Sequence, residues 1–407
     1  MESPFPVKAE IRVASGQEIP EDASPRLTAP PIDGNEVHSL AMDDPGDLER
    51  YRWTCERALA WHGNRSAAEL LAEIPPDAGV DRYGAGGAVE ALEDEMRTVL
   101  GKPAAVFMPS GTMAQQIALR IHAERRGLRS VAFHPTCHLE LHEERAYQHL
   151  HGLSGVPIGD ARELLTLDDL RGLREPLAAV LFELPQREIG GRLPEWTDLE
   201  EQVASARAGG AAVHLDGARL WECTPYYGLS PAAIAALFDT VYVSLYKGLG
   251  GLAGCCLAGE ADVIAEARLW RKRHGGTLFG LWPHAASGLA ALRKRLPLMP
   301  QYFEHALAIA VSLRALSRVT VVPDPPQTPM MHLHLRVGEE AFLDAARRMA
   351  EERSLFTWSR TAAGETPAIR VVELAVGDAT LGFAPHEVAE IVRQLVSGDE
   401  SGAQVRG

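Results

Sequence analysis

A single lysine, Lys247, lies in the middle of the uncharged segment 241–254, VYVSLYKGLGGLAG. The residues before it alternate in a β-strand pattern and glycines follow it, so the lysine is predicted to stand where a buried strand ends in a tight turn. Removing an amine from water lowers its pKa and leaves a neutral nucleophile that attacks carbonyl carbons. Schiff-base formation is therefore one interpretation of Lys247, and it depends on the residues that accompany the lysine. The alternative is a lysine whose stem packs on apolar residues while its amine reaches solvent.

A carboxylate, Asp216, follows an earlier strand pattern in VHLDGARL. Because parallel strands present their carboxyl ends to one crevice, Asp216 and Lys247 are predicted to meet in one site. Pyridoxal phosphate chemistry needs this pair, since the lysine holds the aldehyde and the carboxylate keeps the ring nitrogen protonated. Taken alone, Asp216 is explained at least as well by a helix N-cap.

Small polar residues follow another strand pattern in FMPSGTMAQQIALRI, where Ser110, Gly111 and Thr112 precede a helix pattern. Free amides at a helix start, a glycine that permits close approach and two hydroxyls are typical of a phosphate site. An ordinary serine or threonine cap has the same sequence, so this motif gains its meaning from the lysine and the acid.

Five histidines and a cysteine occur between residues 134 and 151. Zinc is one interpretation, because His138 and His142 are four residues apart on a possible helix. The HExxH pattern fails, however, because Ala146 stands where its second histidine is required. The competing interpretation is one imidazole stacked on a cofactor ring. We predict no metal site.

The elements that must position these residues form an α/β pattern. From about residue 46 to 290, short segments that are apolar on both faces alternate with helix patterns, as in a sheet covered by helices on each side. Residues 291–397 have an α+β pattern and are predicted to be a second, smaller domain. Residues 1–45 are predicted to be an arm or a disordered lead-in, and residues 398–407 a polar tail.

The composition excludes several classes of partner. A formal net charge of −15 disfavours nucleic acid and anionic membranes, and no segment approaches the roughly 20 apolar residues of a membrane span. The five cysteines form no CxxC pair, which indicates free thiols in a reducing compartment and no disulfides. We therefore expect a cytoplasmic protein that acts on a small molecule.

Six segments in order, YG, PSGTMA, HLELHE, HLDGAR, YKGLGG and RKRHGG, resemble the signature blocks of the threonine aldolase and β-eliminating lyase family. These are pyridoxal phosphate enzymes of fold type I, in the aspartate aminotransferase superfamily. The resemblance covers about residues 80 to 290. It implies a large domain with a mostly parallel seven-stranded sheet, a smaller α+β C-terminal domain, and a homodimer or homotetramer with shared active sites.

The resemblance also implies roles for individual residues. Lys247 and His138 would be catalytic, with the imidazole over the ring face. Arg219 and Arg370 would lie near the substrate carboxylate, which a planar guanidinium grips through two hydrogen bonds. Arg370 read alone is equally a surface arginine on a strand. The residues implied to bind the cofactor are Ser110, Gly111, Thr112, His138, Asp216, Arg219 and Lys247.

The chain departs from the family in the substrate region. Where the family has a block resembling LENTHNGG, whose histidine is a candidate base, this chain has FELPQREIGG, with Gln186, Arg187 and Glu188. We predict a pyridoxal phosphate-dependent lyase acting on a β-hydroxy or β-substituted α-amino acid, by Cα–Cβ cleavage or β-elimination. In the cleavage reaction His138, Glu188 or a cofactor-bound water would take the hydroxyl proton. The alternatives are a racemase or transaldolase-type biosynthetic variant, and a non-catalytic or metal-binding relative.

Overall fold

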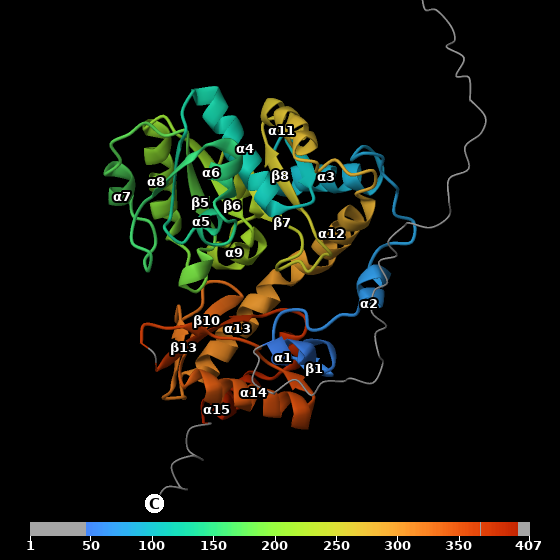
Figure 1. Ribbon diagram of the computed structural model, residues 1–407, viewed down its shortest axis with the longest axis vertical. Coiled ribbons are helices and arrows are strands. Elements are labelled where there is room, and N and C mark those ends of the chain that lie inside the picture. Colours follow the sequence, from blue (N-terminus) through green and yellow to red (C-terminus); the bar gives the residue numbers. More distant parts are fainter. Residues whose placement is uncertain (1–45, 367, 398–407) are drawn as a thin grey trace, which may run out of the picture. The chain divides into compact units, whose positions relative to one another are not determined.

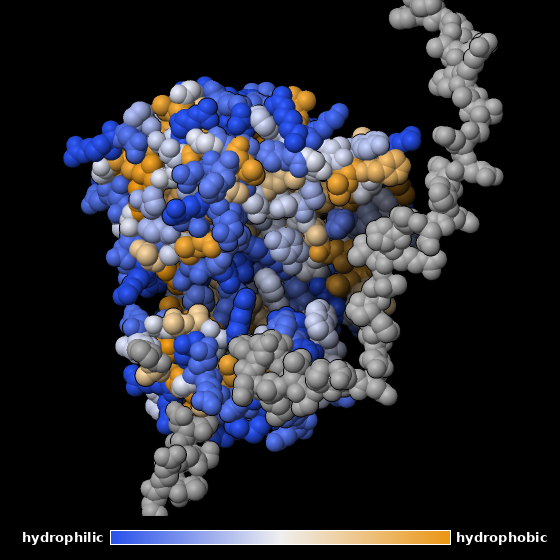
Figure 2. All heavy atoms as spheres, viewed as in Figure 1, coloured by the Kyte–Doolittle hydropathy of each residue, from blue (hydrophilic) through white to orange (hydrophobic). Residues whose placement is uncertain are grey.

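The computed structural model describes residues 46–366 and 368–397 (Figure 1). The predicted N-terminal arm, residues 1–45, and the predicted polar tail, residues 398–407, lie outside the described residues. Within the described part of the chain, no helix combines the length and the apolar character that a membrane crossing requires. The face in Figure 2 is mainly hydrophilic, with apolar residues in separate small groups.

A seven-stranded sheet forms the centre of the large domain. β8 runs antiparallel to both of its neighbours, and all the other neighbouring pairs are parallel. This confirms the predicted mostly parallel sheet. In spatial order the strands are β2 (Ala104–Met108), β8 (Cys255–Gly259), β7 (Thr240–Ser244), β6 (Ala212–Gly217), β5 (Ala179–Glu183), β3 (Ser130–Phe133) and β4 (Ser154–Pro157).

Six of these strands coincide with apolar segments of the sequence, because strands covered by helices are apolar on both faces. The short edge strand β4, with the sequence SGVP and no fully buried residue, has no such signal. The helices of the large domain are α2 (Ala67–Ala72), α3 (Gly87–Leu100), α4 (Gly111–Arg126), α5 (His138–Leu141), α6 (Ala146–His151), α7 (Leu167–Arg171), α8 (Trp196–Ala208), α9 (Leu220–Tyr227), α10 (Pro231–Ala235), α11 (Ala261–Arg273) and α12 (Trp282–Arg295). Figure 1 shows that most of these helices surround the sheet, whereas α2 lies apart from it.

The C-terminal residues form the predicted α+β domain. Its antiparallel sheet has the order β12 (Ala362–Ala363), β13 (Ile369–Ala375), β10 (Met330–Arg336) and β9 (Val319–Val322). Its helices are α13 (Met299–Leu313), α14 (Glu339–Arg353) and α15 (Pro385–Val396). One continuous apolar core includes buried side chains from both sheets.

The first described residues pack on this smaller domain. After α1 (Gly46–Glu49), strand β1 (Arg57–Ala58) pairs with β11 (Leu355–Phe356). The domain boundaries stay a prediction, but β1, which the prediction placed in the large domain, pairs with a strand of the small one. All five cysteines are free and buried.

Candidate active site

A cavity of about 260 Å³ opens at the carboxyl ends of the large-domain strands. It contains six of the eight residues that the sequence assigned to a site, namely Ser110, Gly111, Thr112, His138, Asp216 and Lys247. The remaining residues of its wall are Pro109, Gln115, Glu143, Tyr242, Tyr246, Ala253 and Gly254. The prediction that strand ends bring the lysine and the acid into one crevice is therefore met.

Lys247 stands three residues after the end of β7, in the turn that the glycine-rich sequence predicted. Burial lowers the pKa of its amine, and the positive charge of Arg219 lowers it further, whereas Asp216 and Glu183 act in the opposite direction. A lowered pKa raises the fraction of neutral amine at neutral pH, which is the form that attacks a carbonyl group.

Asp216, in β6, is 2% exposed and faces the cavity. Its Oδ1 accepts a hydrogen bond from the amide of Ala218 at 3.0 Å, and its Oδ2 accepts one from the side-chain amide of Gln115. Both carboxyl oxygens therefore have a donor, and the two bonds fix the orientation of the group at the cavity wall.

A chain of buried hydrogen bonds continues from Gln115 away from the cavity. Gln115 Oε1 lies 2.8 Å from His214 Nε2, and His214 Nδ1 lies 2.8 Å from the hydroxyl of Thr240. The same hydroxyl lies 2.9 Å from His122 Nε2. Burial lowers the pKa of His214 to about 3 and that of His122 to about 4, so both rings are neutral at pH 7. Because the side-chain amide of Gln115 donates to Asp216, its oxygen accepts from His214. The hydroxyl of Thr240 then donates to His214 and accepts from His122, so all the hydrogen bonds of the chain run in the direction of Asp216.

The start of α4 supplies a site for an anion. Ser110 is the N-cap residue, but its side chain makes no capping hydrogen bond, so it does not occupy the first amides of the helix. A Cβ atom on Gly111 would lie 2.2 Å from the hydroxyl oxygen of Tyr242, which is why only glycine fits there. Helix N-termini carry partial positive charge and unpaired N–H groups, and both favour phosphate.

His138 begins α5 and lies on the cavity wall. Its Nδ1 is 3.1 Å from Oε1 of Glu143, and Oε2 of the same carboxylate is buried without a hydrogen-bond partner. When Nδ1 donates to Glu143, Nε2 is left as an acceptor. This geometry suits a base or a ring contact. No pattern in the sequence singled out Glu143 as the partner of His138.

The amine of Lys247, the carboxyl group of Asp216 and the anion site together fit pyridoxal phosphate. The beta-eliminating lyase family model matches residues 68–336. The chain is 32% identical over 281 residues to the low specificity L-threonine aldolase of Escherichia coli strain K12, which covers 68% of this chain and 82% of that protein. This chain belongs to the beta-eliminating lyase family. It is a lyase, and membership of the family implies dependence on pyridoxal phosphate.

Solved structures agree with this assignment. A protein from Listeria monocytogenes, described as a candidate L-allo-threonine aldolase, is 38% identical with a TM-score of 0.81, over 87% of this chain and 99% of its own. The serine palmitoyltransferase of Sphingomonas wittichii has a TM-score of 0.62 at 16% identity, over 86% of this chain and 87% of its own. The second likeness shows the shared fold alone.

Arg219 lies beside the cavity and not on its wall. Its side chain is 7% exposed, and its Nη2 lies 3.4 Å from Oε1 of Glu373. The other oxygen of Glu373 lies 2.8 Å from Nε of Arg187, so one carboxylate bridges two guanidinium groups. Burial opposes ionisation of Glu373, but the two arginines outweigh it and lower its pKa. Both arginines also lower the pKa of Lys247, which indicates that they lie near its amine.

Arg370 is not brought to the cavity. Its Nη2 lies 2.6 Å from Glu339 and its Nε lies 2.8 Å from Thr361, both in the small domain. In β13 it shares a face with the buried Val372, because side chains alternate along a strand. The side chain of Glu373 lies on the opposite face of the sheet. The predicted contact of Arg370 with the substrate carboxylate is therefore not supported.

Two further acids that sequence reasoning missed lie near Lys247, namely Glu183, which is half-buried, and Glu222, which is 2% exposed. Burial, followed by the negative charge of Asp216, raises the pKa of Glu183, which is the register partner of Asp216 in the neighbouring strand. Burial raises the pKa of Glu222 to about 7, and neither of its carboxyl oxygens has a hydrogen-bond partner.

The histidines of segment 134–151 are divided among separate contacts. His134 bonds to Thr136 and to a backbone carbonyl, and His142 Nε2 lies 2.9 Å from Glu188. His151 Nε2 lies 3.1 Å from a ring nitrogen of His274. In residues 46–366 and 368–397 no group of three or more His, Cys, Asp or Glu side chains is arranged to hold a metal ion.

Proposed function

We propose that this protein is a pyridoxal phosphate-dependent lyase that cleaves the Cα–Cβ bond of β-hydroxy-α-amino acids or removes a β-substituent from a related amino acid. One observation carries the proposal: Lys247, Asp216 and the start of α4 line a single cavity. The cofactor needs an amine for its aldehyde, an acid for its ring nitrogen and an anion site for its phosphate. The names of the Escherichia coli and Listeria relatives support a β-hydroxy amino acid as the substrate.

When bound, the cofactor would supply the electron sink for the broken bond. Lys247 would hold it at the cavity wall. His138, whose Nε2 is left as an acceptor by the bond to Glu143, would take the proton of the substrate β-hydroxyl. Glu188 is the weaker candidate for this base, because it is outside the cavity wall and already bonded to His142 and Arg187.

Arg219 and Arg187 would recognise the substrate carboxylate. They are the two arginines whose charges act on the amine of Lys247, and Nε of Arg219 is buried without a hydrogen-bond partner, 4.0 Å from Oε1 of Glu222. Charge-assisted hydrogen bonds to a carboxylate fix its direction, and that in turn orients the Cα bond to be cleaved. Arg370 is bonded to Glu339 and has no part in this proposal.

We further propose a homodimer or homotetramer with shared active sites. Tyr83 and Phe279 are 56% and 64% exposed and contact each other edge to face, which is costly for large aromatic rings unless another surface covers them. Tyr246, on the cavity wall, is 42% exposed. A cytoplasmic location without nucleic-acid or membrane partners stays a prediction from composition.

Borohydride reduction with peptide mapping tests the cofactor site. Protein incubated with pyridoxal phosphate should carry a phosphopyridoxyl group on Lys247, and Lys247→Ala should carry none. A label on another lysine would contradict the site.

Incubation with L-threonine, L-allo-threonine, phenylserine and L-serine then identifies the reaction. Glycine plus an aldehyde indicates cleavage, whereas a keto acid plus ammonia indicates elimination. A labelled Lys247 with neither product from any of the four would contradict the proposed reaction while leaving the cofactor site intact.

A further inference from the structure

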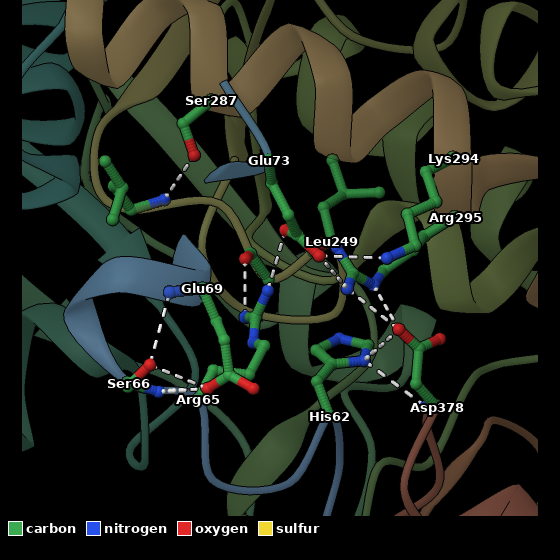
Figure 3. A network of polar contacts seen from close by, with 12 residues as sticks. His62, Arg65, Ser66, Glu69, Glu73, Leu249, Ser287, Lys294, Arg295 and Asp378 are labelled. Atoms are coloured by element: carbon green, nitrogen blue, oxygen red, sulfur yellow. Dashed lines mark hydrogen bonds and ion pairs between the residues drawn. The ribbon is translucent and has the colours of Figure 1, made fainter. Parts of the chain in front are cut away.

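Three successive backbone carbonyls directly after Lys247 are held by side chains from distant parts of the chain. The three side chains, His62, Arg65 and Arg295, are labelled in Figure 3. We call residues 248–250 the lysine loop. The three contacts are His62 Nε2 to the Gly248 oxygen at 2.9 Å, Arg295 Nη1 to the Leu249 oxygen at 2.9 Å, and Arg65 Nη2 to the Gly250 oxygen at 2.7 Å. Each residue of the lysine loop therefore accepts a hydrogen bond from outside it.

Two of these three donors are almost free of solvent, and the third, Arg65, is 20% exposed. The side chains of His62 and Arg295 are 5% and 1% exposed. Gly250 has a φ of +70°, and a Cβ atom there would lie 2.6 Å from the His62 ring and 2.9 Å from the Arg65 guanidinium. A loop held this closely cannot shift unless its donors shift as well.

Asp378 contacts two of the three donors, Arg295 through its carboxylate and His62 through its backbone N–H. The carboxylate lies 2.9 Å from Nε and 2.8 Å from Nη2 of Arg295, and it accepts a further bond from Tyr302. A buried guanidinium needs such a partner, because an uncompensated buried charge is costly. The backbone N–H of Asp378 points to Nδ1 of His62 at 3.4 Å.

The state of His62 follows from these contacts. Burial, and then the positive charge of Arg295, lower the pKa of His62 to about 4, so the ring is neutral at pH 7. Since Nδ1 accepts the N–H of Asp378, the ring hydrogen is on Nε2, which donates to the lysine loop. One residue thus sets both the charge balance of Arg295 and the tautomer of His62.

Asp378 belongs to the small domain, just beyond β13. The segment that carries His62 is bound to the same place, because the amide of Trp61 donates to Ala375 at 2.8 Å and the amide of Ala379 donates to Trp61 at 2.9 Å. Hydrogen bonds therefore connect the small domain to the lysine loop through the segment that carries Trp61 and His62.

We propose that Asp378 is a positioning residue, which acts through Arg295 and His62 to fix Lys247 for reaction. The inference rests on the proposed function in one respect, namely that Lys247 is the reacting amine. It adds that the small domain sets the placement and solvation of this amine, without touching substrate or cofactor itself.

The test compares Asp378→Asn with Asp324→Asn. Asp324 is another small-domain acid with an arginine partner, Arg314, but it has no contact with the lysine loop. In the holoenzyme, Asp378→Asn should lower kcat on the order of 10- to 100-fold with a much smaller change in KM, because small displacements of a reacting group have effects of this size. Asp324→Asn should leave kcat unchanged.

A second readout needs no cofactor. Acetic anhydride labelling followed by peptide mass spectrometry gives the pH at which the amine of Lys247 becomes reactive in the cofactor-free protein. A loosened loop admits water, which weakens the burial that lowers the pKa of Lys247, so this pH should rise in Asp378→Asn and not in Asp324→Asn.

A pair of variants at His62 keeps the inference falsifiable if Asp378→Asn fails to fold. His62→Phe removes the donor to Gly248, whereas His62→Gln retains an N–H group, so the phenylalanine variant should show the larger loss of kcat and the larger labelling shift. Folded variants at Asp378 and His62 with wild-type kcat and labelling would overturn the inference. Wild-type protein without a reducible adduct on Lys247 would instead overturn the proposed function, and the inference with it.

Discussion

Replacing Gln115 by methionine should lower turnover strongly, because it removes the last hydrogen bond of a buried chain that ends on Asp216. Gln115 is 1% exposed, donates to the Asp216 carboxylate and accepts from His214. Methionine has a similar volume and no strong donor or acceptor, so the substitution changes the hydrogen bonding more than the packing.

The size of the effect follows from the type of bond. A hydrogen bond to a charged group contributes about 1.5–3 kcal/mol, and each 1.36 kcal/mol of transition-state stabilisation is about tenfold in rate. If the whole free energy of the hydrogen bond between Gln115 and Asp216 stabilises the transition state, its removal should lower kcat/KM roughly 10- to 150-fold. His214 also loses its acceptor, which should cost about 1–3 kcal/mol of folding stability.

Gln116 provides the matched control. It is the next residue of α4, it is 2% exposed, and its side-chain oxygen has no hydrogen-bond partner. The assay is the rate of aldehyde release at several substrate concentrations, with the melting temperature of each variant measured alongside. A folded Gln115→Met variant that keeps kcat/KM within about twofold of wild type, or equal losses in Gln115→Met and Gln116→Met, would refute the role given to the chain.

Three further predictions concern the site and its stability. Pyridoxal phosphate at about 100 times its Kd should raise the stability of the wild type by about 2.7 kcal/mol, with a much smaller gain in Lys247→Ala, as measured by thermal melting. Arg219→Gln should raise KM for the amino acid roughly 10- to 150-fold, whereas Arg370→Gln should change it little; equal effects in steady-state kinetics would contradict the placement of Arg370. The pKa of His122 is lowered to about 4 by burial, so between about pH 6.5 and about pH 4 the unfolded chain binds a proton that the folded protein does not, and acidification lowers the free energy of unfolding. His122→Gln should make that loss smaller in urea unfolding at about pH 7 and about pH 5, and an unchanged loss would contradict the buried neutral state.

The sequence predicted the fold and the centre of the site because both follow local rules. Buried parallel strands are apolar on both faces, and their carboxyl ends share one crevice. The residues at those ends, such as Ser110, Asp216 and Lys247, could therefore be placed together without knowledge of the tertiary structure. Their partners could not be chosen in the same way, since Glu143 and the lysine-loop donors His62 and Arg295 are selected by packing between distant segments.

Some of what was missed nevertheless had a signal in the sequence. His214 occupies an otherwise apolar strand pattern, and Gln115 lies among the buried residues at the start of α4. A polar side chain in such a position needs a hydrogen-bond partner, because a buried polar group without one is costly. His214 and Gln115 lie on elements that pack together, so a hydrogen bond between them is expected. Both elements also adjoin the cavity, which is where the hydrogen-bond chain ends, at Asp216.

The predicted place of Arg370 could also have been checked against the sequence, by the alternation of side chains along its strand. Its register partner Leu335 is fully buried, and so is the apolar side chain two residues further along its own strand, Val372, at 3% exposure. Strand side chains repeat every two residues, so Arg370 belongs to the face that packs against the small domain's helices, and only a side chain of opposite parity can face the large domain. Glu373 has that parity, and it is the residue that meets Arg187 and Arg219. Motif position alone selected Arg370, whereas the two-residue period of β13 places Arg370 on the face of Val372 and leaves Glu373 for the opposite face.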